Sequence, residues 1–258
     1  MDQVHQLSGH QGEGKRYASL VALIHFLKDI KMPRKPQSKG KCVYCGYETT
    51  KGSMTKHLST CSQRRSTIEQ SDSTQGASEP VYHLRVQSLD VSDFWLHLEI
   101  RGSAPLKELD RYLRAIWLEC CGHLSQFGRG GGWDNKVAKT RQIQAVFTPE
   151  VELVHIYDFG TTSETSIKMA GLRQGKPTTK HPIALMARNL MPEAQCTQCG
   201  KPAVWLCIEC LIEHEVWGTL CDEHIKQHPH NNYGEPIEIV NSPRLGLCGY
   251  TGPADPPY

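Results

Sequence analysis

Residues 81–100 read VYHLRVQSLDVSDFWLHLEI, and this stretch decides the fold class. Apolar and polar residues alternate over 82–86 and again over 94–100, as in strands. After Pro105 the period changes to three and four residues, which predicts a helix that ends near Cys121 and Gly122. Its apolar face is Leu106, Leu109, Leu113, Ile116 and Trp117.

Further short strands are predicted at 123–127, 142–147, 152–157, 165–169 and 183–187. Leading strands, one helix and then more strands are typical of α+β proteins rather than of alternating βαβ units. The sequence therefore predicts an α+β fold: a small mixed or antiparallel sheet domain with a helix, flanked by two small zinc-stabilised modules.

The chain has 258 residues, 38% hydrophobic and 22% charged, which is ordinary for a globular protein and argues against wholesale disorder. Its longest apolar stretch, 18–27, is far shorter than the roughly 20 residues that span a bilayer. Lys28, Asp29 and Lys31 follow it, where a signal peptide would have small residues. We expect a cytoplasmic protein.

Composition divides the chain into six segments. Residues 1–31 form an N-terminal extension, for which two alternatives stay open: translation starting at Met32, or a short amphipathic helix packed on the body. A basic arm and finger (32–65) and a linker rich in Ser, Thr, Gln and Gly (66–80) come next. The α+β domain (81–190), a Cys/His-rich two-zinc module (191–236) and a loose tail (237–258) complete the chain.

Cysteine usage points to metal. The chain has an odd number of cysteines, 11, and no export signal, and eight of the 11 fall in two short clusters that also contain histidines. Such clusters in a cytosolic chain favour metal binding over disulfides. Redox or disulfide use of the CxxC pairs is the alternative.

The first cluster has the spacing C-x2-C, then H-x3-C. Two thiolates at that separation suit a tight knuckle, and a histidine four residues before a cysteine shares its helical face. Four N and S ligands describe a structural zinc site, whose binding energy contributes to folding of so short a unit. The predicted ligands are Cys42, Cys45, His57 and Cys61.

The second cluster has eight ligands in four successive pairs, which fit two tetrahedral ions. Interleaving assigns Cys196, Cys199, Cys221 and His224 to one ion, and Cys207, Cys210, His228 and His230 to the other. His214 competes with His228 or His230, and one shared ion is the alternative to two. The chain is thus expected to bind about three zinc ions.

The order of these pairs resembles B-box-type cross-brace zinc domains over 196–230. The apolar run Ala203-Val204-Trp205-Leu206 before Cys207 matches, as does Thr219-Leu220 before Cys221. Differences are a long gap between the second and third pairs and a single residue between the last two histidines. The resemblance implies a structural or protein-interaction role.

Basic residues concentrate in the arm and finger. Residues 32–65 hold eight Lys or Arg and one Glu, a net charge of +7 in a chain whose total is +2. Such a segment favours contact with DNA or RNA, and a solvated basic tail is the alternative.

The middle of the chain, about 81–190, resembles the plasmid pRiA4b ORF-3-like family. The resemblance rests on the Trp95 strand, the 106–117 helix, Gly122-His123-Leu124-Ser125-Gln126-Phe127 and Tyr157-Asp158-Phe159-Gly160. Leu96 and Thr161 stand where the family usually has Arg and Asp. It implies an α+β fold and a mobile-element setting, and it implies no particular reaction.

The prediction for function is a zinc-binding adaptor that contacts nucleic acid through the finger and protein through the C-terminal module. The rival is an enzyme with a site in the middle domain near His123 and Asp158. No Ser/His/Asp or Cys/His nucleophile with its orienting partner is evident. Cys120 and Cys121, at the end of the predicted helix, are interpreted as core.

Overall fold

The computed structural model describes residues 37–130, 133, 135–230 and 232–258. The chain forms two compact units: residues 37–193 with Ile239–Tyr258, and Ala194–Glu238. The predicted extension 1–31 and the start of the basic arm lie outside the described residues. In the part of the chain that is described, no helix is long and apolar enough to cross a membrane.

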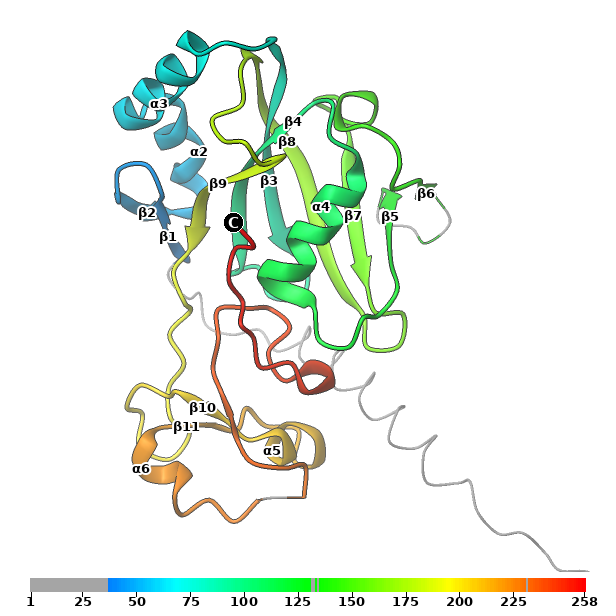
Figure 1. Ribbon diagram of the computed structural model, residues 1–258. Coiled ribbons are helices and arrows are strands. Elements are labelled where there is room, and N and C mark those ends of the chain that lie inside the picture. Colours follow the sequence, from blue (N-terminus) through cyan, green and yellow to red (C-terminus); the bar gives the residue numbers. More distant parts are fainter. Residues whose placement is uncertain (1–36, 131–132, 134, 231) are drawn as a thin grey trace, which may run out of the picture. The chain divides into compact units, whose positions relative to one another are not determined.

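A nine-stranded antiparallel sheet is the framework of the larger unit (Figure 1). Its strand order is β2-β1-β9-β4-β3-β8-β7-β5-β6. The strands are β1 Lys39–Cys42, β2 Glu48–Thr50, β3 Glu79–Ser88, β4 Trp95–Arg101, β5 Ser125–Arg129, β6 Lys136–Val137, β7 Glu152–Tyr157, β8 Ser163–Gly175 and β9 Ile183–Asn189. The α+β class is confirmed, and the sheet is larger than expected because the two strands of the finger join it.

One face of the sheet is covered by α4 (Leu106–Leu113), which continues as a π-helical turn, Arg114–Leu118. Leu106, Leu109 and Leu113 have no exposed surface, because their spacing places them on one side of the helix. They belong to one core with Leu84 of β3 and Leu98 of β4. The predicted helix is confirmed.

The predicted strand at 142–147 is wrong. The structure has a 3-10 turn there, Ile143–Ala145. Ile143, Val146 and Phe147 are all buried. Their spacing of three and four residues lets a helical turn bury them together, which a strand with its period of two does not.

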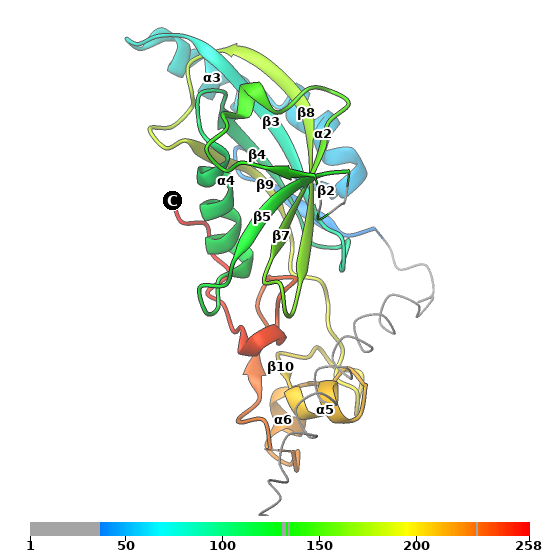
Figure 2. The same cartoon turned by 90° about the vertical axis from the view of Figure 1, so that its right-hand side faces the viewer.

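The finger lies against the opposite face of the sheet (Figure 2). Its helix α2 (Lys51–Thr60) buries Met54 and Leu58 in a second core, together with Cys42 and Trp95. Trp95 is fully buried, and its indole Nε1 donates to Ser38 Oγ at 2.9 Å. The finger is therefore built into the sheet of the larger unit.

Close contact between β1 and Trp95 explains the glycine at position 40. A Cβ atom on Gly40 would lie 2.2 Å from the Trp95 ring and 2.4 Å from the backbone oxygen of Arg188. Because β1 pairs with β9 through Gly40, no other residue fits without moving the strand or the indole.

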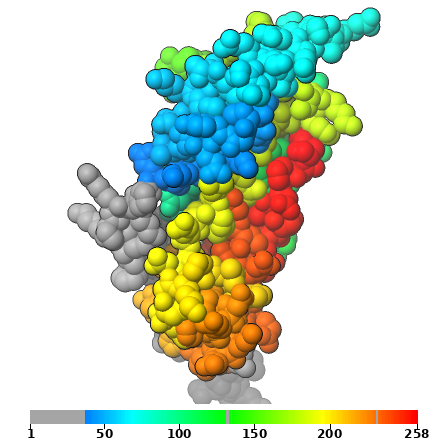
Figure 3. All heavy atoms as spheres, turned by 90° about the vertical axis from the view of Figure 1, so that its left-hand side faces the viewer, coloured from blue at the N-terminus to red at the C-terminus, as the bar shows by residue number. Residues whose placement is uncertain are grey.

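The first half of the predicted linker at 66–80 is helical. The helix α3 covers Ser62–Ser73, and β3 begins at Glu79. No residue of α3 is buried, so its composition is that of a solvent-exposed helix. Polar contacts hold it: Arg64 is 3.8 Å from Glu99, and Asp72 Oδ1 accepts from the backbone N–H of Lys176 at 2.7 Å. Figure 3 shows the finger (blue) and α3 (cyan) as one continuous surface.

The tail at 237–258, predicted to be loose, is also ordered. Arg244 has no exposed surface, and Ser242 Oγ donates to the backbone oxygen of Trp117 at 2.6 Å. The guanidinium of Arg188 donates to the backbone oxygens of Asn241 and Ala254. Its Pro and Gly residues suggested a flexible end, whereas its few polar side chains reach buried partners.

The smaller unit is a three-stranded sheet with two short helices. Its strands, in the order β11-β10-β12, are β10 Trp205–Leu206, β11 Thr219–Leu220 and β12 Ile237–Glu238. Its helices are α5 Ile208–Glu213 and α6 Asp222–Ile225. The buried cluster of this unit consists of four cysteines and Leu220. Apolar burial alone is too small to hold such a unit folded.

Two histidines of the larger unit form a neutral pair. His83 Nε2 on β3 and His97 Nδ1 on β4 are 2.7 Å apart. Burial, with the nearby Arg85 and, for His83, Arg64, lowers the pKa of His83 to about 4 and that of His97 to about 3. One ring must donate and the other accept, which requires at least one neutral imidazole.

This pair predicts a loss of stability in acid. Below the ordinary histidine pKa of 6.5 the two histidines bind protons in the unfolded chain but stay neutral in the folded one. Its contribution is complete above pH 6.5 and is lost as the pH falls toward about 4, at up to about 1.4 kcal/mol per pH unit for each histidine. Urea unfolding at a series of pH values gives the free energy of unfolding of the chain and of the double variant His83→Gln, His97→Gln. The two free energies should converge as the pH falls through this range. His181→Gln is the control, and parallel curves would contradict the prediction.

Candidate metal centres

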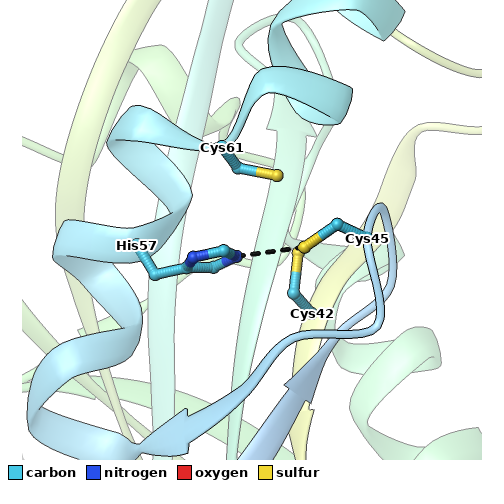
Figure 4. A group of neighbouring side chains, drawn as sticks. All are labelled: Cys42, Cys45, His57 and Cys61. Atoms are coloured by element: carbon cyan, nitrogen blue, oxygen red, sulfur yellow. Dashed lines mark hydrogen bonds between the residues drawn. The ribbon is translucent and has the colours of Figure 1, made fainter.

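The finger brings its four predicted ligands together (Figure 4). Cys42 ends β1, Cys45 follows in the turn, His57 lies on α2, and Cys61 caps the end of that helix. Gly46 closes the turn with φ +75°, and its N–H donates to the Cys42 oxygen at 2.9 Å. One ligand atom from each residue lies within 4.8 Å of the others, and Cys45 Sγ is 3.3 Å from His57 Nε2.

These separations can be compared with those around zinc. A tetrahedral zinc ion has Zn–S bonds of about 2.3 Å and Zn–N bonds of about 2.0 Å. Its ligand atoms are then about 3.8 Å apart for two sulfurs and about 3.5 Å apart for sulfur and nitrogen. The finger separation of 3.3 Å is close to that geometry.

The finger thiols differ in acidity. Burial raises the pKa of Cys42 to about 11. Burial also acts to raise the pKa of Cys61, but hydrogen bonds, among them those from the backbone N–H groups of Arg64 and Gln63, outweigh it and lower that pKa. A metal ion must therefore displace a proton from Cys42, so its binding weakens in acid.

In the smaller unit the first and third predicted pairs meet. Cys199 Sγ is 3.8 Å from Cys221 Sγ, and His224 Nδ1 is 3.4 Å from Cys196 Sγ and 3.3 Å from Cys221 Sγ. Gly200, with φ +71°, closes the knuckle by donating its N–H to the Cys196 oxygen at 2.8 Å. These distances match the tetrahedral values.

The second and fourth pairs meet in the same way. Cys210 Sγ is 3.3 Å from His228 Nε2 and 3.1 Å from His230 Nδ1, and Cys207 Sγ is 3.9 Å from the same His230 atom. Gly218 passes close behind the two cysteines, where a Cβ would lie 2.5 Å from that of Cys210. The structure thus brings the four pairs together in the interleaved order.

His214 takes another position. Its ring stacks on that of His230, with centroids 4.7 Å apart. Within the described residues it forms a group with Glu209 and His230, whereas His228 and His230 form the group with Cys207 and Cys210. Of the alternatives for the last two ligands, the geometry favours His228 and His230.

Each of these three groups supplies four N and S atoms and could hold a metal ion. Four protein ligands complete a tetrahedron and leave no position for water or substrate, which distinguishes structural from catalytic zinc. The chemistry of the donor set suits zinc, since thiolate and imidazole are its usual ligands.

The rival site near His123 and Asp158 has a different character. The two side chains are close, with His123 Nε2 3.5 Å from Asp158 Oδ2. Asp158 is buried, and its carboxylate accepts from Arg244 at 2.5 Å and from the backbone N–H groups of Gly160 and Thr161. Burial acts to raise the pKa of Asp158, but these donors outweigh it and the pKa is lowered. Asp158 is therefore an ionised anchor for Arg244.

Sequence reasoning missed a buried polar network beneath α4. Asp110 accepts from Ser125 Oγ at 2.6 Å and from His155 Nε2 at 2.7 Å, and lies 3.0 Å from Lys139 Nζ. Burial acts to raise the pKa of Asp110, but these partners outweigh it and the pKa is strongly lowered. The signal was available, because Asp110 follows Leu109 and precedes Leu113 on the inward face of the helix. The network holds α4 to β5 and β7.

The fold and its clusters define a class: an α+β protein with a large antiparallel sheet and Cys/His clusters at both ends that could form small zinc modules. No protein-family model matches the chain, and no curated protein matches it. Among solved structures it is similar to the crystal structure of MM3350, a protein of unknown function from Methanosarcina mazei Go1. That match has 19% identity and a TM-score of 0.37, and covers 43% of this chain and 69% of the other.

Proposed function

We propose that this chain is a zinc-binding adaptor, in which three structural zinc ions stabilise one surface for nucleic acid and another for protein. The observation that carries the zinc proposal is the convergence of three complete Cys/His quartets with the separations of tetrahedral ligands. The test is the zinc content of the purified chain, in which each quartet should account for one ion.

A reducing compartment belongs to this proposal, because the quartets need their cysteines as thiolates. A cytoplasmic location would supply it. The mobile-element setting implied by the resemblance to the pRiA4b ORF-3-like family is likewise kept as a proposal, and it is compatible with an adaptor that binds nucleic acid.

Nucleic-acid binding is supported by the charges that the finger exposes. Lys39 and Lys41 are exposed on β1, Lys56 on α2 and Arg65 on α3. Strand alternation turns Lys39 and Lys41 away from α2, because Gly40 and Cys42 face it, so these cations surround the finger instead of forming one flat patch. Such side chains neutralise phosphates without reading bases.

The other basic residues of the finger have partners in the chain. Lys51 Nζ donates to the backbone oxygen of Ser92 at 3.1 Å. Arg64 Nη1 donates to the backbone oxygen of Leu58 at 3.1 Å and reaches Glu99. We therefore assign the phosphate contacts to the four exposed residues.

Replacing these four residues by Gln should weaken binding to single- or double-stranded oligonucleotides and flatten its salt dependence. Each lost phosphate contact should reduce the slope of log affinity against log salt by about 1. Substitution is preferable to deletion of 32–65, since deletion would remove two strands of the sheet. Four exposed residues elsewhere, Lys107, Arg129, Lys136 and Lys180, give the matched control. If the finger variant and the control variant gave equal slopes of log affinity against log salt, these four residues would not be the phosphate contacts.

Protein binding is supported by an exposed apolar pair in the smaller unit. Val216 and Trp217, between α5 and β11, are 51% and 45% exposed. A photoreactive residue in place of Trp217 should crosslink a discrete partner in cell extract, because apolar contacts of this kind form the centre of interfaces. The same residue in place of exposed Gln198 is the control. Indistinguishable crosslinking patterns from the two positions would count against a partner on this surface.

A further inference from the structure

The three cysteines outside the quartets meet at one place. Cys120 and Cys121 follow the π-helical turn after α4, and Cys248 lies near the C-terminus, about 127 residues further along the chain. With His123 they form a fourth group whose ligand atoms all lie within 4.8 Å of one another. Cys121 and Cys248 are exposed, so the interpretation of Cys121 as core is wrong.

We infer that Cys120, Cys121, His123 and Cys248 form a fourth metal site, for zinc or a similarly thiophilic divalent ion. Cys121 Sγ is 3.9 Å from Cys248 Sγ, and His123 Nε2 is 3.4 Å from Cys248 Sγ. These are the separations of the other three groups and of a tetrahedral ion, about 3.8 and 3.5 Å. A disulfide would instead bring the two sulfurs to about 2.05 Å.

Two turns aim the ligands at this point. Gly122, between Cys121 and His123, has φ +72°, which lets the chain reverse so that both neighbours face the same side. Cys248 has φ 51° and lies between Gly246 and Gly249, which also have positive φ. A non-glycine residue rarely adopts this conformation, and here it directs the sulfur to His123.

Outer contacts suit a metal-bound thiolate at Cys120. Arg244 Nη2 donates to Cys120 Sγ at 3.5 Å, and a cation in this position stabilises a thiolate ligand. Tyr157 Oη is 3.8 Å from the same sulfur. Asp158 is 3.5 Å from His123 Nε2, but its oxygens already accept from Arg244 and two backbone N–H groups. It therefore belongs to the surroundings of the site.

A metal ion here would join the C-terminal segment to the end of the α4 region. Arg244, Ser242 and Cys248 then fix the same segment through an ion pair, a hydrogen bond and a metal bond. The site is separate from the adaptor proposal, since none of its ligands belongs to the finger or to the smaller unit.

Differential alkylation of the native full-length chain tests the site without any substitution. Cys121 is exposed, so as a free thiol it should react readily with iodoacetamide. As a zinc ligand under reducing conditions it should react slowly, and a chelator should speed its alkylation on the order of tenfold. Equal alkylation rates with and without chelator would overturn the proposal. Protection that is lost only on adding a stronger reductant would also overturn it, because it would indicate a disulfide.

Metal analysis gives the second test. The chain should bind one zinc ion more than the three quartets explain, and Cys248→Ser and Cys121→Ser should each lose that ion alone. Leu124→Ser changes an exposed neighbour of His123 and should keep it. Cobalt substitution should show one fewer tetrahedral thiolate site in the two cysteine variants. Unchanged metal content in Cys248→Ser and Cys121→Ser would refute the site, whatever the state of the other three.

Discussion

Replacing Cys207 with serine is expected to remove one zinc ion and unfold Ala194–Glu238, while the larger unit stays folded. Cys207 is 2% exposed, caps α5 and belongs to a buried cluster formed mainly by cysteines. A unit this small has little apolar surface to bury, so metal binding supplies its folding free energy. Structural zinc in isolated fingers contributes about 10–16 kcal/mol, far more than the stability of so small a unit.

Limited proteolysis with mass spectrometry and zinc analysis measures this result. New cleavage sites should fall between Ala194 and Glu238, and the larger unit should keep its protected fragments. Lys201→Ser, at an exposed position of the same unit, is the control and should keep all the zinc. A Cys207→Ser chain that resists protease and loses an enzymatic activity would show that the metal is a catalyst.

The ligand pairs within the three quartets were predictable because each pair depends on local geometry. Two cysteines separated by two residues can bind one ion from a tight turn, and a histidine four residues before a cysteine lies on the same helical face. The structure brings the pairs together in the predicted interleaved order. The choice between His214 and the later histidines was not predictable, because it depends on how the chain returns after α6.

The position of the finger on the sheet could not be predicted from the sequence, because it depends on contacts between distant residues. Nothing in the spacing of its ligands indicates that β1 pairs with β9, since those residues are about 147 apart along the chain. Trp95 reads as a strand residue, and only the tertiary structure shows that it faces Met54 and Leu58. The same holds for Cys248, which no local pattern connects to His123.

Polar composition misled at both ends of the sheet domain. Ser, Thr and Gln in α3 reflect a helix whose contacts are ion pairs and hydrogen bonds, such as those of Asp72 with Lys176. The tail is similar, because the buried Arg244 pairs with Asp158 and lies over the Tyr157 ring. Composition indicates how much a segment can bury by apolar packing. The tail instead buries a charge pair, and α3 is held by polar contacts without burying any residue.

Replacing Trp95 with alanine is expected to lower the free energy of unfolding of the larger unit by about 3–5 kcal/mol and to weaken the finger zinc. The indole is fully buried between β1 and α2, so its removal leaves a cavity beside Cys42 and frees Ser38. That loss is a large part of a typical stability of about 5–15 kcal/mol.

Urea unfolding and chelator competition for zinc measure the two effects together. Trp217→Ala, at a tryptophan that is 45% exposed in the smaller unit, should change the stability of the larger unit by less than about 0.5 kcal/mol. If the finger were an independent module, Trp95→Ala would destabilise the sheet and leave the zinc affinity of the finger unchanged. Because Cys42 shares a core with Trp95 and β1 shares a ladder with β9, the two losses should instead occur together.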